Sequence, residues 1–410
     1  MPSISDENNV ASATVILTGS TGSLGSYLLD SLTNLSHVKR VYCLNRAEDG
    51  QARQKDVNGT RGLATHWDNS RVEFLHVDLS QPGFGLSREK YLQLLREATH
   101  IIHNQWPVNF NWDLSSFEPY IKGVRHLLDF CLDSPRQVEF LFISTIGTVS
   151  HVNTSKPVPE RPNHKLSPDL GGYSASKHIC ELIIEEHVKS TSHKKAAICR
   201  VGQIAGPVLK KNGMWGKQEW LPTIIASSKH IGVLPSDLGS MDEVNWVPVD
   251  LLSDIVLELS GVVPSSDRST QKLSRVANGL KGDLRPSSHF MGAAENSNSI
   301  SVYHAVNPHS VDWVKLAPTV ASLVGIDSSN IVPWKQWVDG LRLSEKASNL
   351  EMNPGVKLLD FFESLDVKGR GDMMMPPLAT VVSSTKSKTM ASLSPVGTEW
   401  MALWVKQWDL

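Results

Sequence analysis

Residues 16–30, ILTGSTGSLGSYLLD, are the most informative segment for the fold class. They place Gly19, Gly22 and Gly25 at intervals of three between an apolar run and a helical pattern. Glycine lets the backbone bend tightly and approach a pyrophosphate, while the N-terminus of a helix offers free N–H groups and a partial positive charge. The context predicts a dinucleotide-binding turn rather than an ordinary tight turn, because a second apolar strand ends about 20 residues further on. The cofactor contacts expected here are Gly19, Thr21, Gly22, Ser23, Leu24 and Gly25.

The residues that follow the second strand indicate which dinucleotide is bound. Val41–Leu44 is followed by Asn45 and Arg46 instead of an acidic residue, which would bind the ribose 2'-hydroxyl of NAD and repel a 2'-phosphate. Arg46 can pair with that phosphate, with Arg53 as a second basic contact, so we expect NADPH. The alternative is that Arg46 is a solvated surface charge. Asp78, in HVDLS, lies where it reaches the adenine together with Leu79, or else caps a turn.

Alternating strand and helix patterns predict the fold class. We expect an α/β protein, a Rossmann-type doubly wound parallel sheet with a smaller, mainly helical C-terminal substrate domain. The expected strands are Thr14–Leu17, Val41–Leu44, Val72–Val77, Thr99–His103, Glu139–Ser144 and Ala196–Val201. The expected helices are Phe117–Asp133, Tyr173–Lys189, Val311–Val324, Trp334–Leu341, Val356–Leu365 and Glu399–Trp408.

The rhythm of these patterns also suggests domain boundaries. Residues 1–12 read as a disordered lead or linker, and residues 13–205 as the NADP-binding domain, to which the chain returns near 244–260 and 300–307. Residues 206–410 read as a domain that binds substrate and carrier, with a mobile insert at 265–300 rich in serine, asparagine and glycine. Trp112, Trp215, Trp220 and Trp246 line a pocket for a flat acyl group or fill the core.

The segment GGYSASKHICE carries the chemistry. Tyr173 and Lys177 are four residues apart and therefore lie on one helical face. A phenol ionises near pH ~10, but an adjacent ammonium and a cationic nicotinamide favour the phenolate, and Lys177 also binds the nicotinamide ribose. Upstream, the strand in FLFISTIGT ends in Ser144 and Thr145, whose hydroxyls stabilise a developing oxyanion or contact the cofactor. A surface tyrosine stacked on a lysine stem is the alternative.

Composition excludes several other functions. The 410 residues contain 40 Lys plus Arg against 42 Asp plus Glu, without a basic run, so we expect no nucleic-acid partner. The start MPSISDENNVASA lacks the features of a secretory signal and no apolar stretch approaches ~20 residues, so we expect a cytoplasmic chain without membrane contact. We expect no metal, because His151, His164, His304 and His309 have no ligand spacing.

Longer strings resemble a known family. TGSTGSLG, LNR, HVDL, FISTIGT, GYSASK and WVPVD together resemble the extended short-chain dehydrogenase/reductase family over about residues 13–260. HNQWPVNFNWDLSSFEPYIKGVRHLLDFC, RVGQIAGP and YHAVNPHSVDW resemble the terminal thioester reductase domains of fungal polyketide synthases and nonribosomal peptide synthetase-like enzymes. The second resemblance is more specific and covers most of the chain.

This resemblance implies an activity and a partner. A Thr-Tyr-Lys triad would fall on Thr145, Tyr173 and Lys177, with Asn104 at the cofactor and Gln105, Trp106 and Gln203 at the substrate. The implied reaction is NADPH-dependent release of an acyl chain, held as a thioester on the phosphopantetheine arm of a carrier protein, as an aldehyde or further to an alcohol. The chain is expected to act as a monomer. Two alternatives stay open: a stand-alone extended dehydrogenase or epimerase acting on a small carbonyl or sugar, and a module that senses NADPH without turning it over.

Overall fold

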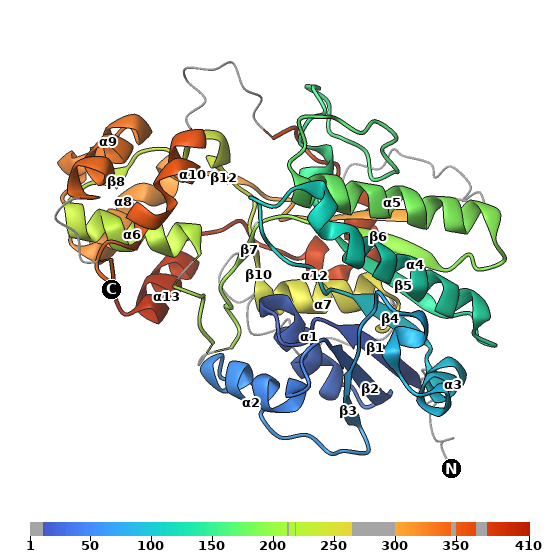
Figure 1. The fold of residues 1–410 in the computed structure, drawn as a ribbon. Helices are drawn as coiled ribbons and strands as arrows, with labels where there is room; N and C mark the ends of the chain where they lie inside the picture. The colour runs from blue at the N-terminus through green and yellow to red at the C-terminus, as the bar shows by residue number, and fades with distance from the viewer. Residues whose placement is uncertain (1–10, 211–212, 218, 265–299, 346–349, 366–374) are drawn as a thin grey trace, which may run out of the picture.

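The computed structural model describes residues 11–210, 213–217, 219–264, 300–345, 350–365 and 375–410. Figure 1 shows two lobes: a twisted sheet wrapped in helices, and beside it a cluster of helices that includes α6, α8 and α9. Apart from Ile300, the predicted insert at 265–300 lies outside the described residues, as do residues 1–10 of the predicted lead.

One seven-stranded parallel sheet forms the first lobe. Its order is β11-β6-β5-β4-β1-β2-β3, and every neighbouring pair is parallel. The strands are β1 Ala13–Thr18, β2 Val38–Asn45, β3 Val72–His76, β4 His100–His103, β5 Glu139–Thr145, β6 Ala196–Val201 and β11 Ser301–Ala305. The predicted class is therefore confirmed, and the carboxyl ends of the strands meet at one edge, where ligands bind in such folds.

Helices cover both faces of this sheet because successive strand residues point in opposite directions. In β1, Val15 and Leu17 pack into one apolar cluster with residues of α1 (Ser23–Thr33) and α7 (Val249–Leu259). Ile16 packs into the opposite cluster, with residues of α3 (Arg88–Glu97), α4 (Glu118–Asp133) and α5 (Gly172–Ser190). Helix α2 (Gly50–Thr60) joins β2 to β3 in the chain. The sheet is thus buried on both faces, which explains why its strands are continuously apolar instead of alternating.

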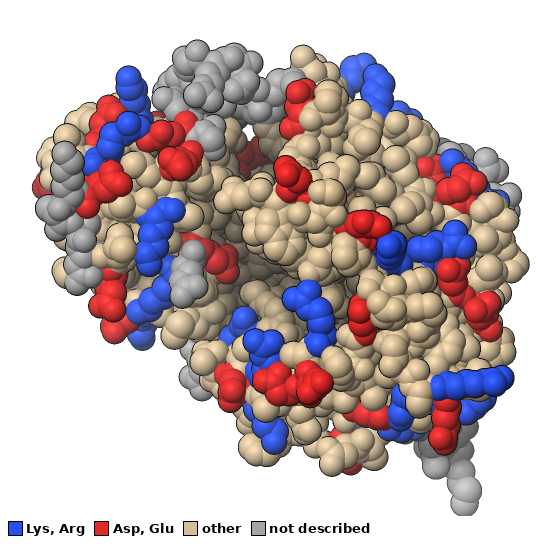
Figure 2. Space-filling view, in the orientation of Figure 1, with Lys and Arg blue, Asp and Glu red and all other residues tan. Residues whose placement is uncertain are grey.

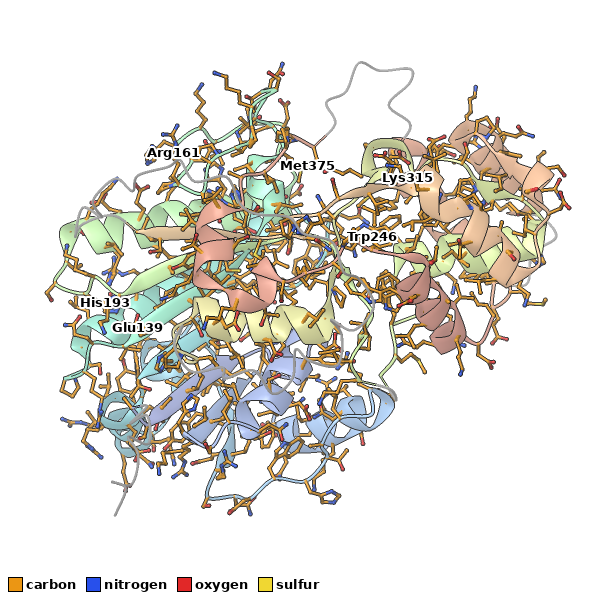
Figure 3. All side chains as sticks on the ribbon, turned by 180° about the vertical axis from the view of Figure 1, so that it is seen from behind. Glu139, Arg161, His193, Trp246, Lys315 and Met375 are labelled. Carbon is orange, nitrogen blue, oxygen red and sulfur yellow. The ribbon has the colours of Figure 1, made fainter. Side chains whose placement is uncertain are left out.

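The second lobe is built around tryptophans. Its helices are α6 Trp220–Ile231, α8 Trp313–Val324, α9 Trp334–Ser344, α10 Leu359–Ser364 and α13 Thr398–Trp408. Trp215 and Trp246 are buried in its core, so these two are filler rather than pocket walls. Figure 3 shows Trp246 near the junction of the two lobes. The short pairs β8 (Leu234–Pro235) with β13 (Ile331–Val332) and β9 (Glu243–Val244) with β12 (Val311–Asp312) complete the lobe.

The chain passes between the lobes more than once. The short strands β7 (Ile204–Ala205) and β10 (Val247–Pro248) pair where it crosses. Later, α11 (Val381–Lys386) and α12 (Lys388–Ala391) contact α7 in the first lobe, although they lie within the segment 206–410. The predicted domain boundaries stay a prediction.

Two kinds of feature are absent from the described part of the chain. None of its helices is both long and apolar enough to cross a membrane. In the same residues, no three His, Cys, Asp or Glu side chains gather as metal ligands would.

Candidate active site

In the turn after β1, the positions of Gly19 and Gly25 have no room for a side chain. Gly19 has φ +69°, and a Cβ there would lie 2.8 Å from Cα of Gln105. A Cβ on Gly25 would lie 2.0 Å from the carbonyl oxygen of Gly19. Gly22 is the N-cap of α1 and provides no side-chain cap, so the first N–H groups of the helix, at Ser23 and Leu24, point at the turn. Such a turn at a helix N-terminus suits an anionic ligand.

Strand β4 holds the turn in place. The Thr18 hydroxyl oxygen accepts hydrogen bonds from the backbone N–H groups of Asn104 and Gln105, both at 3.0 Å. The Asn104 side-chain amide donates to the carbonyl oxygen of Gly19 at 3.2 Å. The structure thus brings Asn104 against the glycine turn. Its role as a cofactor contact stays a prediction.

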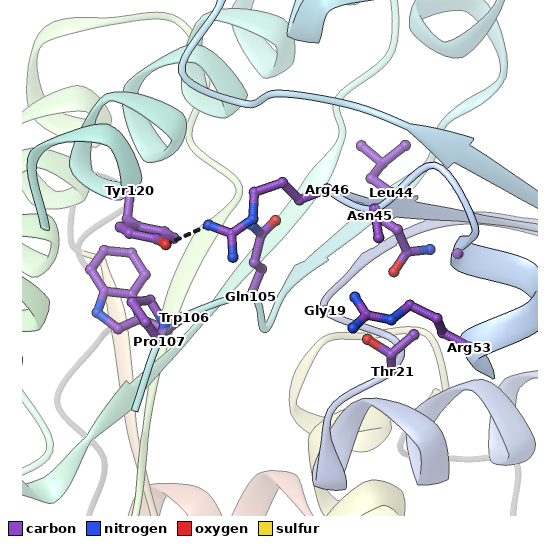
Figure 4. Close-up of a pocket in the computed structure, with 12 residues that line it drawn as sticks. Gly19, Thr21, Leu44, Asn45, Arg46, Arg53, Gln105, Trp106, Pro107 and Tyr120 are labelled. Carbon is purple, nitrogen blue, oxygen red and sulfur yellow. Dashed lines mark hydrogen bonds between the residues drawn. The ribbon is translucent and has the colours of Figure 1, made fainter. Parts of the chain in front are cut away.

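A cavity of about 270 Å³ opens beside this turn (Figure 4). Its described lining includes two arginines and no carboxylate: Gly19, Thr21, Leu44, Asn45, Arg46, Ala47, Gly50, Arg53, Gln105, Trp106, Pro107 and Tyr120. Arg46 Nη1 donates a 2.7 Å hydrogen bond to the Tyr120 hydroxyl, which aims the guanidinium across the cavity mouth. Figure 2 shows basic side chains at the rim of the hollow between the lobes. The donor set fits a dinucleotide that carries an additional phosphate.

A second cavity of about 190 Å³ shares Arg46, Gln105 and Tyr120 with the first and contains the Asp78 and Leu79 side of the site. Asp78 Oδ1 accepts from the Ser80 hydroxyl at 2.7 Å and from its N–H at 2.9 Å. These hydrogen bonds hold the pKa of the Asp78 carboxyl below its usual range, so it is a carboxylate acceptor at neutral pH. Such an acceptor suits an exocyclic amino group.

Lys177 is buried and lines neither cavity, but it packs on Trp106, which lines the first. Its Nζ donates to the carbonyl oxygen of Ile143 at 2.5 Å and lies 4.3 Å and 4.5 Å from the ring centroids of Trp106 and Phe142. Burial lowers the pKa of Lys177 to about 7, against the nearby Cys180 and Glu181, which favour the ammonium. The charged and neutral forms of Lys177 are therefore close in free energy near neutral pH.

Tyr173 lies one turn earlier on α5, among aromatic rings. Its ring centroid is 5.2 Å from that of Phe110 and 6.4 Å from that of Phe117. Burial raises the pKa of the Tyr173 phenol to about 12, opposite to the lowering that the sequence suggested. The Lys177 ammonium, which was expected to contribute to that lowering, is instead directed at the carbonyl oxygen of Ile143. The phenol therefore keeps its proton at neutral pH, which is the form that a proton donor requires.

Thr145 ends β5 beside the start of α5. Its hydroxyl oxygen accepts from the backbone N–H of Gly147 at 3.1 Å. A Cβ on Gly147 would lie 2.5 Å from the hydroxyl oxygen of Ser174, the residue that follows Tyr173. The turn after β5 and the first turn of α5 are thus in close contact, and Gly147 is a site residue that the sequence patterns did not single out.

Three other predicted residues lie in different surroundings. The Ser144 hydroxyl donates at 2.6 Å to the buried carboxylate of Glu181 and lines neither cavity. Gln203 donates from Nε2 to the carbonyl oxygen of Ile204 and accepts from Trp220 Nε1 at 2.9 Å, so its amide joins the lobes. Arg53 lines the first cavity with its Nε 3.9 Å from Asp49. Of these three, the structure brings only Arg53 to the cavities.

The parallel sheet and the glycine turn after its first strand define a Rossmann-type dinucleotide-binding fold. More narrowly, residues 17–256 match the NAD-binding family described as male sterility protein, and the chain belongs to that family.

The relatives agree with the second resemblance. A carboxylic acid reductase of Neurospora crassa is 38% identical over 100% of this chain and 36% of its own length. The non-reducing polyketide synthase dbaI of Emericella nidulans is 32% identical over 96% of this chain and 14% of its own. The chain thus spans about a third or less of these curated relatives.

Solved structures show the same fold. The terminal R domain from the myxalamid PKS-NRPS pathway superposes with a TM-score of 0.69 at 20% identity, covering 97% of this chain and 90% of its own. The reductase domain of a nonribosomal peptide synthetase from Mycobacterium tuberculosis gives the same TM-score, 0.69, and identity, 20%, over 97% and 92%.

Proposed function

We propose that this chain uses NADPH to release an acyl group, bound as a thioester to the phosphopantetheine arm of a carrier protein, as an aldehyde. The observation that carries the proposal is the position of Lys177 Nζ, 4.3 Å from the centroid of the Trp106 ring that also lines the arginine-bearing cavity. Tyr173 precedes Lys177 by one turn of the same helix. The relatives support the acyl thioester as substrate, since they include a carboxylic acid reductase and a polyketide synthase.

We assign one group of residues to each part of NADPH. The N–H groups from Ser23 to Gly25 would bind the pyrophosphate, Arg46 and Arg53 the 2'-phosphate, and Asp78 with Leu79 the adenine. When bound, NADPH supplies the hydride for the carbonyl carbon. Lys177 and Asn104 would orient the nicotinamide ribose from α5 and from the end of β4.

Side chains at the carboxyl edge of the sheet would supply a proton and hydrogen bonds to the carbonyl oxygen of the substrate. Reduction of a thioester consumes one NADPH and one proton, breaks the C–S bond and gives an aldehyde, a thiol and NADP⁺. The Tyr173 phenol, protonated at neutral pH, donates toward the carbonyl oxygen. Thr145 accepts from Gly147, so its own proton is available to the same oxygen.

The substrate would enter over the loop that follows β4. Gln105 and Trp106 line the cavity, and beyond them Val108 and Phe110 are 69% and 68% exposed, although Phe110 packs edge-on against Tyr173. An acyl chain whose carbonyl reaches Tyr173 would cover these two side chains. Gln203 as a substrate contact stays a prediction.

One assay tests the proposal against its alternatives. NADPH consumption is followed with an acyl-pantetheine thioester, then with simple aldehydes and sugars, using the chain and Tyr173→Phe. Thioester-dependent consumption that Tyr173→Phe abolishes, with NADPH binding retained, is the expected result. Consumption with a small carbonyl or sugar alone would favour the stand-alone dehydrogenase, and tight binding without turnover would favour the sensor. Mass spectrometry of the product distinguishes aldehyde from alcohol.

A further inference from the structure

A buried ion pair lies one helical turn beyond Lys177. Glu181, on α5, and Arg200, on β6, have side chains 3% and 0% exposed. Glu181 Oε2 accepts from Arg200 Nη2 at 2.6 Å, and Arg200 Nε lies 3.1 Å from each carboxylate oxygen. A buried pair of this kind costs desolvation free energy that its attraction does not reliably recover, so it is weak support for a purely stabilising role.

The carboxylate holds the chain on both sides of Thr145. Ser144, which precedes it, donates to Glu181 Oε1 at 2.6 Å. Thr148, three residues after it, has its hydroxyl oxygen 3.1 Å from the same Oε1 and 3.0 Å from the carbonyl oxygen of Thr145. Glu181 therefore fixes the end of β5 and the turn that follows, Ile146–Val149.

Arg200 is fixed in turn from the other side. Its Nη1 donates to His304 Nε2 at 3.2 Å and to the carbonyl oxygen of Arg161 at 3.3 Å. The other ring nitrogen of His304 lies 2.8 Å from the carbonyl oxygen of Ala379, a donor position. Burial beside Arg200 lowers the pKa of His304 to about 4, so the ring is neutral and accepts from the guanidinium. The guanidinium is thus immobilised by groups from three separate segments.

We infer that Glu181 and Arg200 are a positioning pair for the reductase reaction: they hold Thr145 at the substrate carbonyl and keep a negative charge beside the Lys177 ammonium. The inference rests on the proposed function, because it takes Thr145 and Lys177 as parts of the reacting site. Neither Glu181 nor Arg200 would touch the substrate.

Few titratable groups face Lys177. Cys180 and Glu181 act on it from α5, and His103 from β4. Burial raises the pKa of the Cys180 thiol to about 12 and lowers that of His103 to about 3, so both are neutral near pH 7. Of the three, Glu181 is therefore the source of the negative charge that favours the Lys177 ammonium. Its removal lowers the pKa of Lys177 further and leaves less ammonium at a given pH.

Glu181→Gln in the full chain tests this, with Glu185→Gln as matched control. Glu185 lies one turn further along α5 and pairs with His164 and Lys189 instead. We expect Glu181→Gln to lower kcat by roughly tenfold or more at little change in the KM for NADPH. The apparent pKa of the alkaline limb of its pH profile should move down by about one unit. Glu185→Gln should change neither kcat nor this apparent pKa. A folded Glu181→Gln variant within about twofold of wild-type kcat and with an unmoved pH profile would overturn the inference.

Two further measurements cover the ways in which this test fails. If Glu181→Gln does not fold, Ser144→Ala with Thr148→Val removes the link to Thr145 and leaves the ion pair intact. We then expect kcat to fall severalfold with the KM for NADPH unmoved, and unchanged kcat overturns the inference.

A pH titration of ¹⁵N-lysine-labelled protein, with Lys177→Met assigning the signal, needs no turnover. Its midpoint must fall in Glu181→Gln, even if the wild type reduces no thioester and the proposed function fails; an unmoved midpoint contradicts the role of the charge.

Discussion

Lys177 Nζ lies 4.3 Å from the centroid of the Trp106 ring, so a single indole joins the Lys177 face of α5 to the cavity beside the glycine turn. Trp106 is held there by a 3.3 Å hydrogen bond from its Nε1 to the Ser176 hydroxyl. The ring face and the Ile143 carbonyl together replace part of the hydration that Lys177 loses. The arrangement explains how a lysine is retained in a buried position beside a ligand site.

Arg46→Ala is expected to weaken NADPH binding by about 10- to 100-fold, since a hydrogen bond to a charged group contributes about 1.5–3 kcal/mol. NADH, which lacks the 2'-phosphate, should bind as before. Titration of the cofactor's fluorescence with both nucleotides measures the two affinities. An unchanged ratio of the two would show that Arg46 is a solvated charge.

Tyr120→Phe tests how much the orientation of the Arg46 guanidinium contributes to binding, because it leaves the charge of Arg46 in place. The variant removes the hydroxyl that accepts from Arg46 Nη1 and keeps the aromatic ring, 6.0 Å from the guanidinium carbon. Because this contact is exposed, we expect only about a two- to fivefold loss of NADPH affinity and none for NADH. A loss as large as that of Arg46→Ala would mean that Tyr120 contacts the cofactor directly.

Gly19→Ala should abolish cofactor binding and destabilise the fold by about 1–3 kcal/mol or more, because it combines a positive φ with a Cβ pressed against the Gln105 backbone. Gly171→Ala is the matched control, since no atom lies within 4 Å of the Cβ it adds. Chemical denaturation and NADPH titration check both variants. A stable Gly19→Ala chain that binds NADPH normally would contradict the geometry of the turn.

Gly147→Ala should slow the reaction and Ser174→Ala should rescue it. The new Cβ would meet the Ser174 hydroxyl oxygen at 2.5 Å, whereas the next contacts, with Thr145 Oγ1 at 3.4 Å and the Ser174 Cβ at 3.5 Å, are ordinary. The clash would push Thr145 away from the first turn of α5, and removal of the hydroxyl relieves it. We expect Gly147→Ala to lose roughly tenfold or more in kcat. The measurement is the kcat of both single variants and the double variant; failure of the rescue would place the cause elsewhere.

The fold and the central pair of the site could be predicted from sequence because they depend on local patterns and chain order. In a parallel sheet the carboxyl ends of all strands share one edge, so Gly19, Arg46, Asn104 and Thr145 had to gather there once the strands were recognised. Tyr173 and Lys177 share a helical face by spacing alone. None of these inferences needed a long-range contact to be known.

What depends on long-range contacts could not be predicted. Successive residues of a strand face opposite ways, and the pattern of FIST did not show that the Ser144 hydroxyl meets Glu181. The direction of the Tyr173 pKa shift required knowing that the phenol is buried and that Lys177 is directed at Ile143. The contact of α12 with α7 joins segments more than a hundred residues apart, which no local pattern encodes.

Burial of Lys177 also predicts how stability depends on pH. Its folded pKa of about 7 lies below the ordinary 10.5, so between these values the unfolded chain binds more protons than the folded chain. The free energy of unfolding therefore gains up to about 1.4 kcal/mol per pH unit from this residue as pH rises above 7. The buried cysteines, with pKa values raised above 9.0, oppose this gain only at higher pH, when thiols of the unfolded chain ionise. Buried His103 and His304, whose pKa values are also lowered, give a smaller rise just above pH 7 that both proteins share. Urea denaturation from pH 7 to about 8.5 should accordingly show a steeper rise in the wild type than in Lys177→Met. Equal pH slopes in the two proteins would mean that Lys177 is solvated rather than buried against Trp106.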